Sequence, residues 1–387
     1  MIAFFGDLAR QLNPPVLNIG LGQQISILNL EGPIFDPKEI NDVLPLKAGP
    51  RLYSCSAMLK SFIDDKSSWI FSLANNHSID FGEAGLLATL ESLTKSDIRY
   101  CGAGRNKEEA TQVTKLEVNG VGIAIISCAD RGFGYATTSE AGFALEGNWV
   151  FNEINSAIQG NLLPVVLYHG GVEDFSLPSP YTKQLFESWV DLGAKLVIGT
   201  HSHVPQPIVK YGSSVICYGL GNYLVNPNEW QKSGDAALSS LGLVFDPVSE
   251  EFTVHQLRVL LNEHGETEVS QTAFSNDLVH RLKVCHDILN DSELHTAVWQ
   301  EMCNYVKSSW LMKHFVYAFV TEIAPSVFKR IPYVGKFFRI PYAIDTLAWS
   351  THREMLLELS SIRNGAAKNR RSEISSTLWS VVKGKSN

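Results

Sequence analysis

The sequence predicts an α/β fold with a layered core, and three observations support this. Over residues 1–260, apolar runs of strand length alternate with segments of helical periodicity, which is typical of layered α/β proteins. The last two predicted strands, 241–245 and 251–260, are adjacent, so we expect a mixed sheet. The 387 residues are 45% hydrophobic and 19% charged, a composition that suits a large folded core.

Each predicted strand is a short apolar run followed by glycine or polar residues. We expect strands at residues 1–5, 26–30, 69–74, 121–128, 164–168, 195–199, 215–218, 241–245 and 251–260. A helix should begin near Phe81 or Gly82, where leucines follow at helical spacing. A second should begin at Pro180, since Ser179 suits the N-cap and Gly193 the C-terminal end.

The character of the chain changes after about residue 272. Residues 277–324 have a mainly helical pattern, and a final helix is expected over 343–363. We therefore divide the chain into a first domain at 1–270, a helical region at 271–363 and a basic, mobile tail at 364–387. Residues 326–342 mix basic and aromatic side chains, which allows peripheral contact with an anionic membrane. Their three helix-breaking residues favour the alternative, a loop whose aromatic side chains pack on the core.

Polar side chains with metal-binding or acid–base chemistry recur at the ends of the predicted strands. They are Asp7, Asn29, Glu31, Asn76, His77, His169, His201 and His203. Because residues i and i+2 of an extended backbone project to one side, we expect the last two histidines to converge. Carboxylate, amide and imidazole groups together suit a pair of divalent cations such as Mn, Fe or Zn. Two such ions would clamp a phosphoryl group and lower the pKa of a bound water to about 7.

These motifs resemble the CapA family of capsule and poly-gamma-glutamate synthesis proteins, in the calcineurin-like metallophosphoesterase superfamily. The matching motifs are Gly6-Asp7, Asn29-Leu-Glu31, Leu73-Ala-Asn-Asn-His77 with Asp80-Phe-Gly82, His169-Gly-Gly-Val-Glu173, Gly199-Thr-His-Ser-His203 and Gly219-Leu-Gly-Asn222. They follow the family's order along residues 1–225. The resemblance implies a four-layer α/β/β/α sandwich, to which this chain adds a helical C-terminal extension.

The resemblance also implies the metal ligands. Six residues would share two divalent ions: Asp7 and His203 on the first, Asn76, His169 and His201 on the second, and Glu31 between them. Metallophosphoesterases usually have a histidine two residues after the first aspartate, but this chain has Ala9 there. The first ion would therefore have fewer protein ligands than the second.

Further roles follow from the same resemblance. His77 would be the general acid that protonates the leaving group. Asp80 would either orient His77 or cap the next helix. Asn29 and Glu173 would support the ligands without binding the metal themselves. Asn222 would either shape the site from its glycine-rich loop or simply form that turn.

Two functions remain open on the sequence alone. The first is a dinuclear phosphatase or phosphodiesterase that acts on a phosphorylated small molecule or on a glycan or polymer precursor in capsule or surface-polysaccharide synthesis. The second is a non-hydrolytic component of a capsule or poly-gamma-glutamate synthesis complex, partnered by the synthesis enzymes. The net charge of −8 argues against nucleic-acid binding. Without a predicted signal peptide or membrane span, we expect a cytoplasmic location, with peripheral attachment at the inner membrane face as the alternative.

Overall fold

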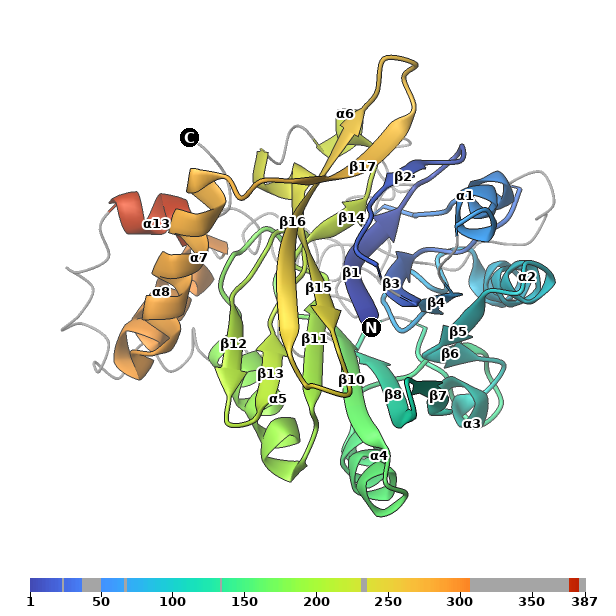
Figure 1. The fold of residues 1–387 in the computed structure, drawn as a ribbon, viewed down its shortest axis with the longest axis horizontal. Helices are drawn as coiled ribbons and strands as arrows, with labels where there is room; N and C mark the ends of the chain where they lie inside the picture. The colour runs from blue at the N-terminus through green and yellow to red at the C-terminus, as the bar shows by residue number, and fades with distance from the viewer. Residues whose placement is uncertain are drawn as a thin grey trace, which may run out of the picture.

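The computed structural model describes residues 1–22, 24–36, 50–65, 68–132, 134–230, 235–306 and 376–382. A nine-stranded mixed sheet forms the first half of the core (Figure 1). Its strands, in spatial order, are β2 (Val16–Asn18), β17 (Thr267–Thr272), β16 (Phe252–Leu261), β15 (Ser239–Phe245), β1 (Ile2–Ala9), β3 (Ile25–Glu31), β4 (Ser68–Ser72) and β5 (Arg99–Cys101), with β14 (Asn222–Leu224) also paired to β1. Strands β1, β3, β4 and β5 run parallel, whereas β15 and β16 form an antiparallel pair, so the sheet is mixed as predicted.

A six-stranded sheet forms the second half of the core. Its order is β12 (Ile208–Tyr211), β13 (Ser214–Cys217), β11 (Leu196–Thr200), β10 (Leu163–His169), β8 (Val121–Ala129) and β7 (Thr114–Val118). The four central strands are parallel and the two edge strands are antiparallel. A separate two-stranded sheet joins β6 (Ala103–Gly104) to β9 (Gly142–Phe143). Because parallel strands place their carboxyl ends at one edge, each large sheet presents its loops to the same region.

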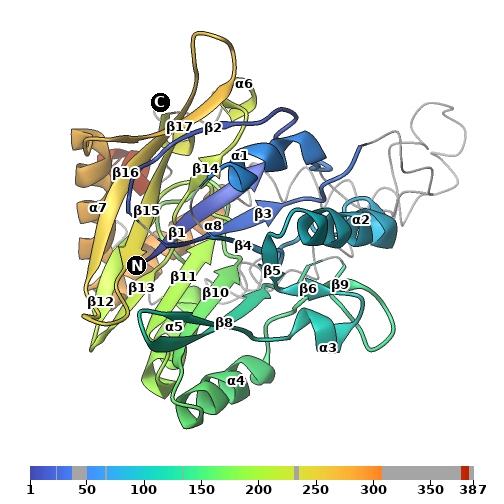
Figure 2. The ribbon, with the colours of Figure 1, turned by 45° about the vertical axis from the view of Figure 1, so that its right-hand side comes forward.

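Helices cover the outer faces of both sheets (Figure 2). The first sheet is flanked by α1 (Leu59–Ile63) and α2 (Gly82–Lys95), and the second by α4 (Asn148–Gln159) and α5 (Pro180–Leu192). The shorter helices are α3 (Lys107–Ala110) and α6 (Pro227–Trp230), with 3-10 turns at Ser56–Met58 and Asp235–Leu238. This arrangement confirms the predicted four-layer sandwich.

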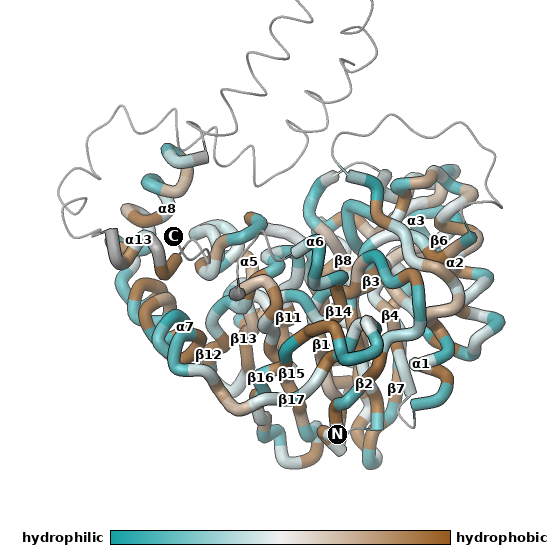
Figure 3. Tube along the Cα trace, turned by 90° about the horizontal axis from the view of Figure 1, so that it is seen from above, coloured by the Kyte–Doolittle hydropathy of each residue, from teal (hydrophilic) through white to brown (hydrophobic). Residues whose placement is uncertain are grey.

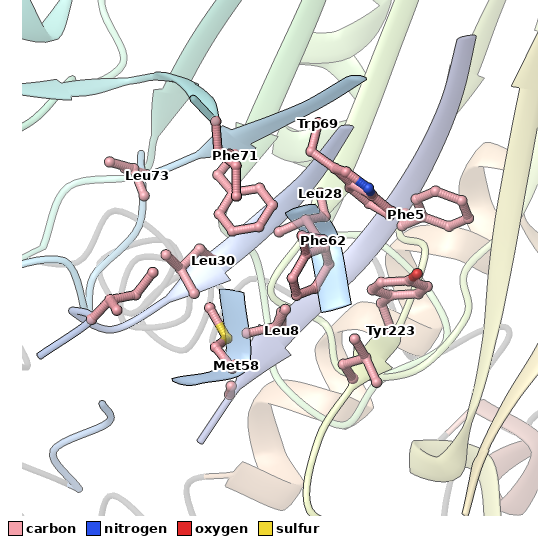
Figure 4. Packing of buried hydrophobic residues seen from close by; sticks show 14 of the residues in the cluster. Phe5, Leu8, Leu28, Leu30, Met58, Phe62, Trp69, Phe71, Leu73 and Tyr223 are labelled. Carbon is pink, nitrogen blue, oxygen red and sulfur yellow. The ribbon is translucent and has the colours of Figure 1, made fainter. Parts of the chain in front are cut away.

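Three apolar clusters hold the layers together, and apolar residues run along the central strands in Figure 3. Side chains alternate along β1, so this one strand contributes residues to two of the three clusters. Ile2 and Phe4 face the second sheet, whereas Ala3 and Phe5 face the helices. On the outer side, Phe5 stacks on Tyr223 with a centroid separation of 4.5 Å (Figure 4). Burial of both faces explains why these strands are continuous apolar runs.

The predicted helix starts are confirmed. Helix α2 begins at Gly82, and Ser179 Oγ accepts a hydrogen bond from Thr182 N at the start of α5. Gly193 ends α5 with a φ of 120°, a conformation that favours glycine. Strand β17 was not predicted, because its sequence of alternating polar residues, Thr267–Thr272, lacks an apolar run.

Beyond the two sheets, helices α7 (Asn276–Leu289), α8 (Ser292–Val306) and α13 (Ser376–Val382) pack together beside the second sheet (Figure 1). The predicted helical character of 277–324 holds as far as Val306; the expectations for 307–324, 326–342 and 343–363 lie outside the described residues. Residues 376–382 differ from the expected mobile tail, since Val382 is buried in the apolar cluster of the second sheet. The division into three parts stays a prediction. No helix among the described residues is long and apolar enough to cross a membrane.

Candidate metal centre

The first sheet contributes two buried carboxylates. Asp7 lies inside β1 rather than after it, at a register shift in the pairing with β3. Gly6 permits this because Gly221 O would lie 1.7 Å from any Cβ there, and Asp7 N donates to the same oxygen over 3.0 Å. Glu31 ends β3, and both carboxylates are 0% exposed.

An amide network fixes the orientation of the first carboxylate. Asn29 Nδ2 donates to Asp7 Oδ1 over 2.8 Å and lies 3.1 Å from His169 Nδ1. Asn75 Nδ2 in turn donates to Asn29 Oδ1 over 3.2 Å and to Leu30 O over 2.7 Å. Asn29 therefore contacts a ligand-type residue of each sheet, and its role in supporting these ligands stays a prediction.

The second sheet contributes three buried imidazoles. His169 ends β10, and the turn after β11 carries His201 and His203. The expectation that this pair lies on an extended backbone is wrong, since their φ angles are 87° and 56°. The two histidines still face the same site, with ring centroids 5.9 Å apart, because the turn bends left-handed at both. Such angles are rare outside glycine and mark a functional or strained turn.

Ligand-type atoms from both sheets gather in two overlapping groups. Glu31, His169 and His201 form one, and Asp7, Glu31 and His203 form the other, with atoms within 4.8 Å of one another in each. Asn76 Oδ1 lies 2.9 Å from His169 Nε2, which lies 3.3 Å from Glu31 Oε1. Two atoms that bind one ion at about 2.1 Å and at a right angle lie about 3.0 Å apart. The donor set therefore fits divalent cations, and Glu31 belongs to both groups.

The charges of the site favour a bound cation. Burial lowers the pKa of His169 well below its ordinary value, and the nearby histidines lower it further, so its ring is a neutral donor. Burial also disfavours a charged His203, but Glu31 and Asp7 outweigh burial and raise the pKa of His203 to about 10. Two buried carboxylates thus stabilise positive charge, which a metal ion can supply in place of that proton.

A separate contact orients the expected general acid. His77 Nδ1 lies 2.7 Å from Asp80 Oδ2, which also accepts a hydrogen bond from Leu52 N over 2.7 Å. Helix α2 has Phe81 at its N-cap and no side-chain capping bond there. Asp80 thus contacts His77, and its role in orienting that ring stays a prediction. Since Nδ1 faces the carboxylate, Nε2 is the ring nitrogen that can deliver a proton.

Two further predicted residues lie next to the histidines. Asn222 is buried in β14, is paired with Asp7 and places Oδ1 3.0 Å from His203 Nδ1. Glu173 Oε1 lies 3.9 Å from His201 Nε2, and its side chain is 57% exposed. Ala9 pairs in register with Glu31, which places an apolar residue beside the shared carboxylate.

Sequence reasoning missed three residues that shape the site. Asn75 stands inside the quoted Asn-Asn-His motif, and His77 N donates to its Oδ1 over 3.0 Å. Thr200 Oγ1 lies 3.0 Å from His169 Nδ1, and its position before His201 was a usable signal. The ring of Trp230 lies 4.5 Å from that of His203, a contact for which the sequence offered no signal.

One known protein family matches this chain over most of the two-sheet core. The family model described as "Bacterial capsule synthesis protein PGA_cap" matches residues 14–227, more than half of the sequence. The chain belongs to this family. The resemblance of its motifs to CapA proteins is thus confirmed, as is its relation to capsule and polyglutamate biosynthesis at the level of the family.

Two curated relatives and one solved structure give the degree of similarity. The chain is 32% identical over 176 residues to the capsule biosynthesis protein CapA of Bacillus anthracis, covering 44% of this chain and 43% of that one. It is 30% identical over 180 residues to the PGA biosynthesis protein CapA of Bacillus subtilis, covering 46% and 47%. The matched segment therefore spans less than half the length of these relatives. The solved structure of Haemophilus influenzae NAD nucleotidase aligns over 56% of this chain and 36% of its own length, at 16% identity and a TM-score of 0.28.

Proposed function

We propose that this chain is a divalent-metal-dependent phosphoester hydrolase that acts on a glycan or polymer precursor in capsule or surface-polysaccharide synthesis. The observation that carries the proposal is the pair of ligand groups that share Glu31, together with Asn76, the residue before His77, whose Oδ1 lies 2.9 Å from His169 Nε2. The assigned ligands are Asp7, Glu31, Asn76, His169, His201 and His203. Two ions bound there would supply Lewis-acid chemistry, holding phosphoryl oxygens and acidifying a water.

The side chains around the ligands would transfer the proton and orient the reacting groups. His77 would deliver a proton from Nε2 to the leaving-group oxygen, while Asp80 holds Nδ1 and fixes the direction of the ring. Asn75 secures the backbone of the same turn through His77 N. Asn29 keeps Asp7 oriented, and Asn222 keeps His203 oriented, so both ligands are preorganised.

Turnover by the purified full-length protein tests this proposal. The protein would be loaded with Mn²⁺ and assayed on sugar phosphates and a model phosphodiester. We expect hydrolysis that falls about 10²-fold or more in His77→Ala with unchanged metal content, because a positioned general acid contributes this much. The matched control is His280→Ala, an exposed histidine of α7. Equal rates for wild type and His77→Ala with every metal and substrate would contradict the hydrolase.

The alternative is a non-hydrolytic component of a capsule or poly-gamma-glutamate synthesis complex that uses the site to bind polymer. Ala9 favours it, because it stands where metallophosphoesterases usually have a further histidine ligand beside the group of Asp7, Glu31 and His203. Equilibrium binding of a phosphorylated precursor without turnover, lost in Glu31→Gln, would favour this function over hydrolysis. Turnover that depends on His77 would exclude it.

A further inference from the structure

The loop between β10 and α5, residues 170–179, is tied to the turn that carries the two left-handed histidines. Asp174 N donates to Ser202 O over 2.9 Å, and Gln206 Nε2 donates to Phe175 O over 2.8 Å. The loop carries Glu173, one residue before the first of these contacts. On this side, therefore, the loop and the candidate metal ligands are fixed to each other.

The C-terminal helices hold the same loop from the other side. Ser176 N donates to Val382 O over 2.8 Å, and the Phe175 ring lies 6.2 Å from that of Trp379, both contacts with α13. His295 of α8 donates from Nε2 to Pro178 O over 2.9 Å. These anchors lie well beyond residue 227, where the family match ends.

Apolar packing reinforces these bonds. Phe175 and Leu177 are buried in the cluster that also contains Val382, and Trp379 packs against it. The Trp379 ring lies 5.9 Å from that of Tyr305, so α13 also contacts α8. Figure 1 shows α13 beside α7 at the margin of the second sheet. Helix α13, in the C-terminal part of the chain, therefore packs against the loop 170–179 and helps to hold it in place.

Glu173 depends on that support more than its neighbours do. Its side chain is 57% exposed, so the loop backbone, and not packing, sets its position. The loop backbone also takes left-handed conformations, with a φ of 103° at Gly171 and 63° at Asp174, and at a non-glycine residue this persists only where surrounding contacts hold it. Fixing such a segment in advance removes the entropy cost of ordering it when a ligand binds.

We propose that α8 and α13 position Glu173 so that its carboxylate joins His203 in holding a divalent cation, with Trp379 as the main positioning residue. Ligand-type atoms of Glu173, His201 and His203 lie within 4.8 Å of one another. Glu173 would thereby add a carboxylate to the group that Ala9 leaves short of a ligand. The cation part of this inference rests on the proposed function, whereas the anchoring of the loop does not.

Two measurements on the full-length protein test the inference. The first is hydrogen exchange of residues 170–179, and the second is Mn²⁺ affinity by competition with a chromophoric chelator. In Trp379→Ala we expect the amides of Asp174 and Ser176 to exchange at least about tenfold faster and Mn²⁺ affinity to fall about tenfold. Trp379→Phe should restore both. Trp149→Ala, which removes a tryptophan of α4 from the same cluster, is the control and should change neither.

The same substitution made in a Glu173→Gln protein distinguishes positioning of Glu173 from a general loss of stability. In Glu173→Gln, the further change Trp379→Ala should accelerate loop exchange again but cause no additional loss of Mn²⁺ affinity. Unchanged loop exchange in Trp379→Ala, or an equal loss of affinity with and without Glu173, would overturn the inference. If wild type binds no Mn²⁺, the proposed function and the role of Glu173 both fail, while hydrogen exchange alone still decides whether α13 anchors the loop.

Discussion

The two sheets contribute opposite chemistry to the candidate metal centre. The nine-stranded sheet places the buried carboxylate of Asp7 inside β1 and that of Glu31 at the end of β3. The six-stranded sheet places the imidazoles of His169, His201 and His203 at the ends of β10 and β11. Neither half is a complete ligand set, so the packing of the sheets against each other assembles the site. A buried acidic half also requires positive charge from the other half or from a cation.

The two halves also differ in how their side chains are held. Asp7 and Glu31 lie on strands, where hydrogen bonds to neighbouring strands fix the backbone. His201 and His203 lie on a turn with left-handed φ angles, and the loop 170–179 fixes that turn through Ser202. Strand-borne ligands are preorganised by the sheet itself, whereas turn-borne ligands need support from outside it.

The residue that the two halves share should give the largest effect. Glu31→Gln keeps the shape of the side chain but removes the charge common to both ligand groups. We expect Mn²⁺ affinity to fall about 100-fold or more at every site, measured by chelator competition. Glu187→Gln on α5, with its ion pair to Lys183, is the control for loss of one carboxylate. Retention of one ion at wild-type affinity would show that Glu31 is not shared.

A substitution at Asp80 should lower the rate of catalysis by a smaller factor without changing the metal content. Asp80→Asn preserves the size of the group but weakens its contact with His77. If wild type hydrolyses phosphoesters, kcat should fall roughly 10–100-fold while the metal content stays constant. Metal analysis and steady-state kinetics on one preparation would check this. Loss of metal together with activity would instead place Asp80 among the structural supports of both halves.

The smallest effect concerns the outer support of the second sheet. Burial lowers the pKa of His295 and nearby Lys183 lowers it further, although the bond to Pro178 O opposes both. The unfolded chain then binds more protons than the folded one below about pH 6.5, so stability falls as pH falls through that value. Denaturant unfolding should show this loss of stability between about pH 6.5 and pH 5, and the loss should be smaller in His295→Gln. An identical pH dependence in both proteins would contradict the assignment.

Sequence predicted the first half of the site better than the second. Apolar runs of strand length predicted the parallel strands, and the common direction of two side chains on one strand follows from its alternation, as for Asn29 and Glu31. The placement of Asp7 inside β1 was missed because it depends on the approach of Gly221, which is distant in sequence. The left-handed turn at His201 and the helix over 376–382 were missed for the same reason, since tertiary packing determines both.

Metal counting on two histidine variants tests the central claim most directly. His201 belongs to the group with Glu31 and His169, and His203 to the group with Asp7 and Glu31, so we expect the two histidines to bind different ions. Mass-spectrometric metal analysis after dialysis against Mn²⁺ should find two ions per wild-type chain and one in His203→Ala, which retains the tighter site. His201→Ala should lose the tighter site instead. Two ions in both variants, or none in both, would contradict a centre in which the two sheets hold two ions through a shared Glu31.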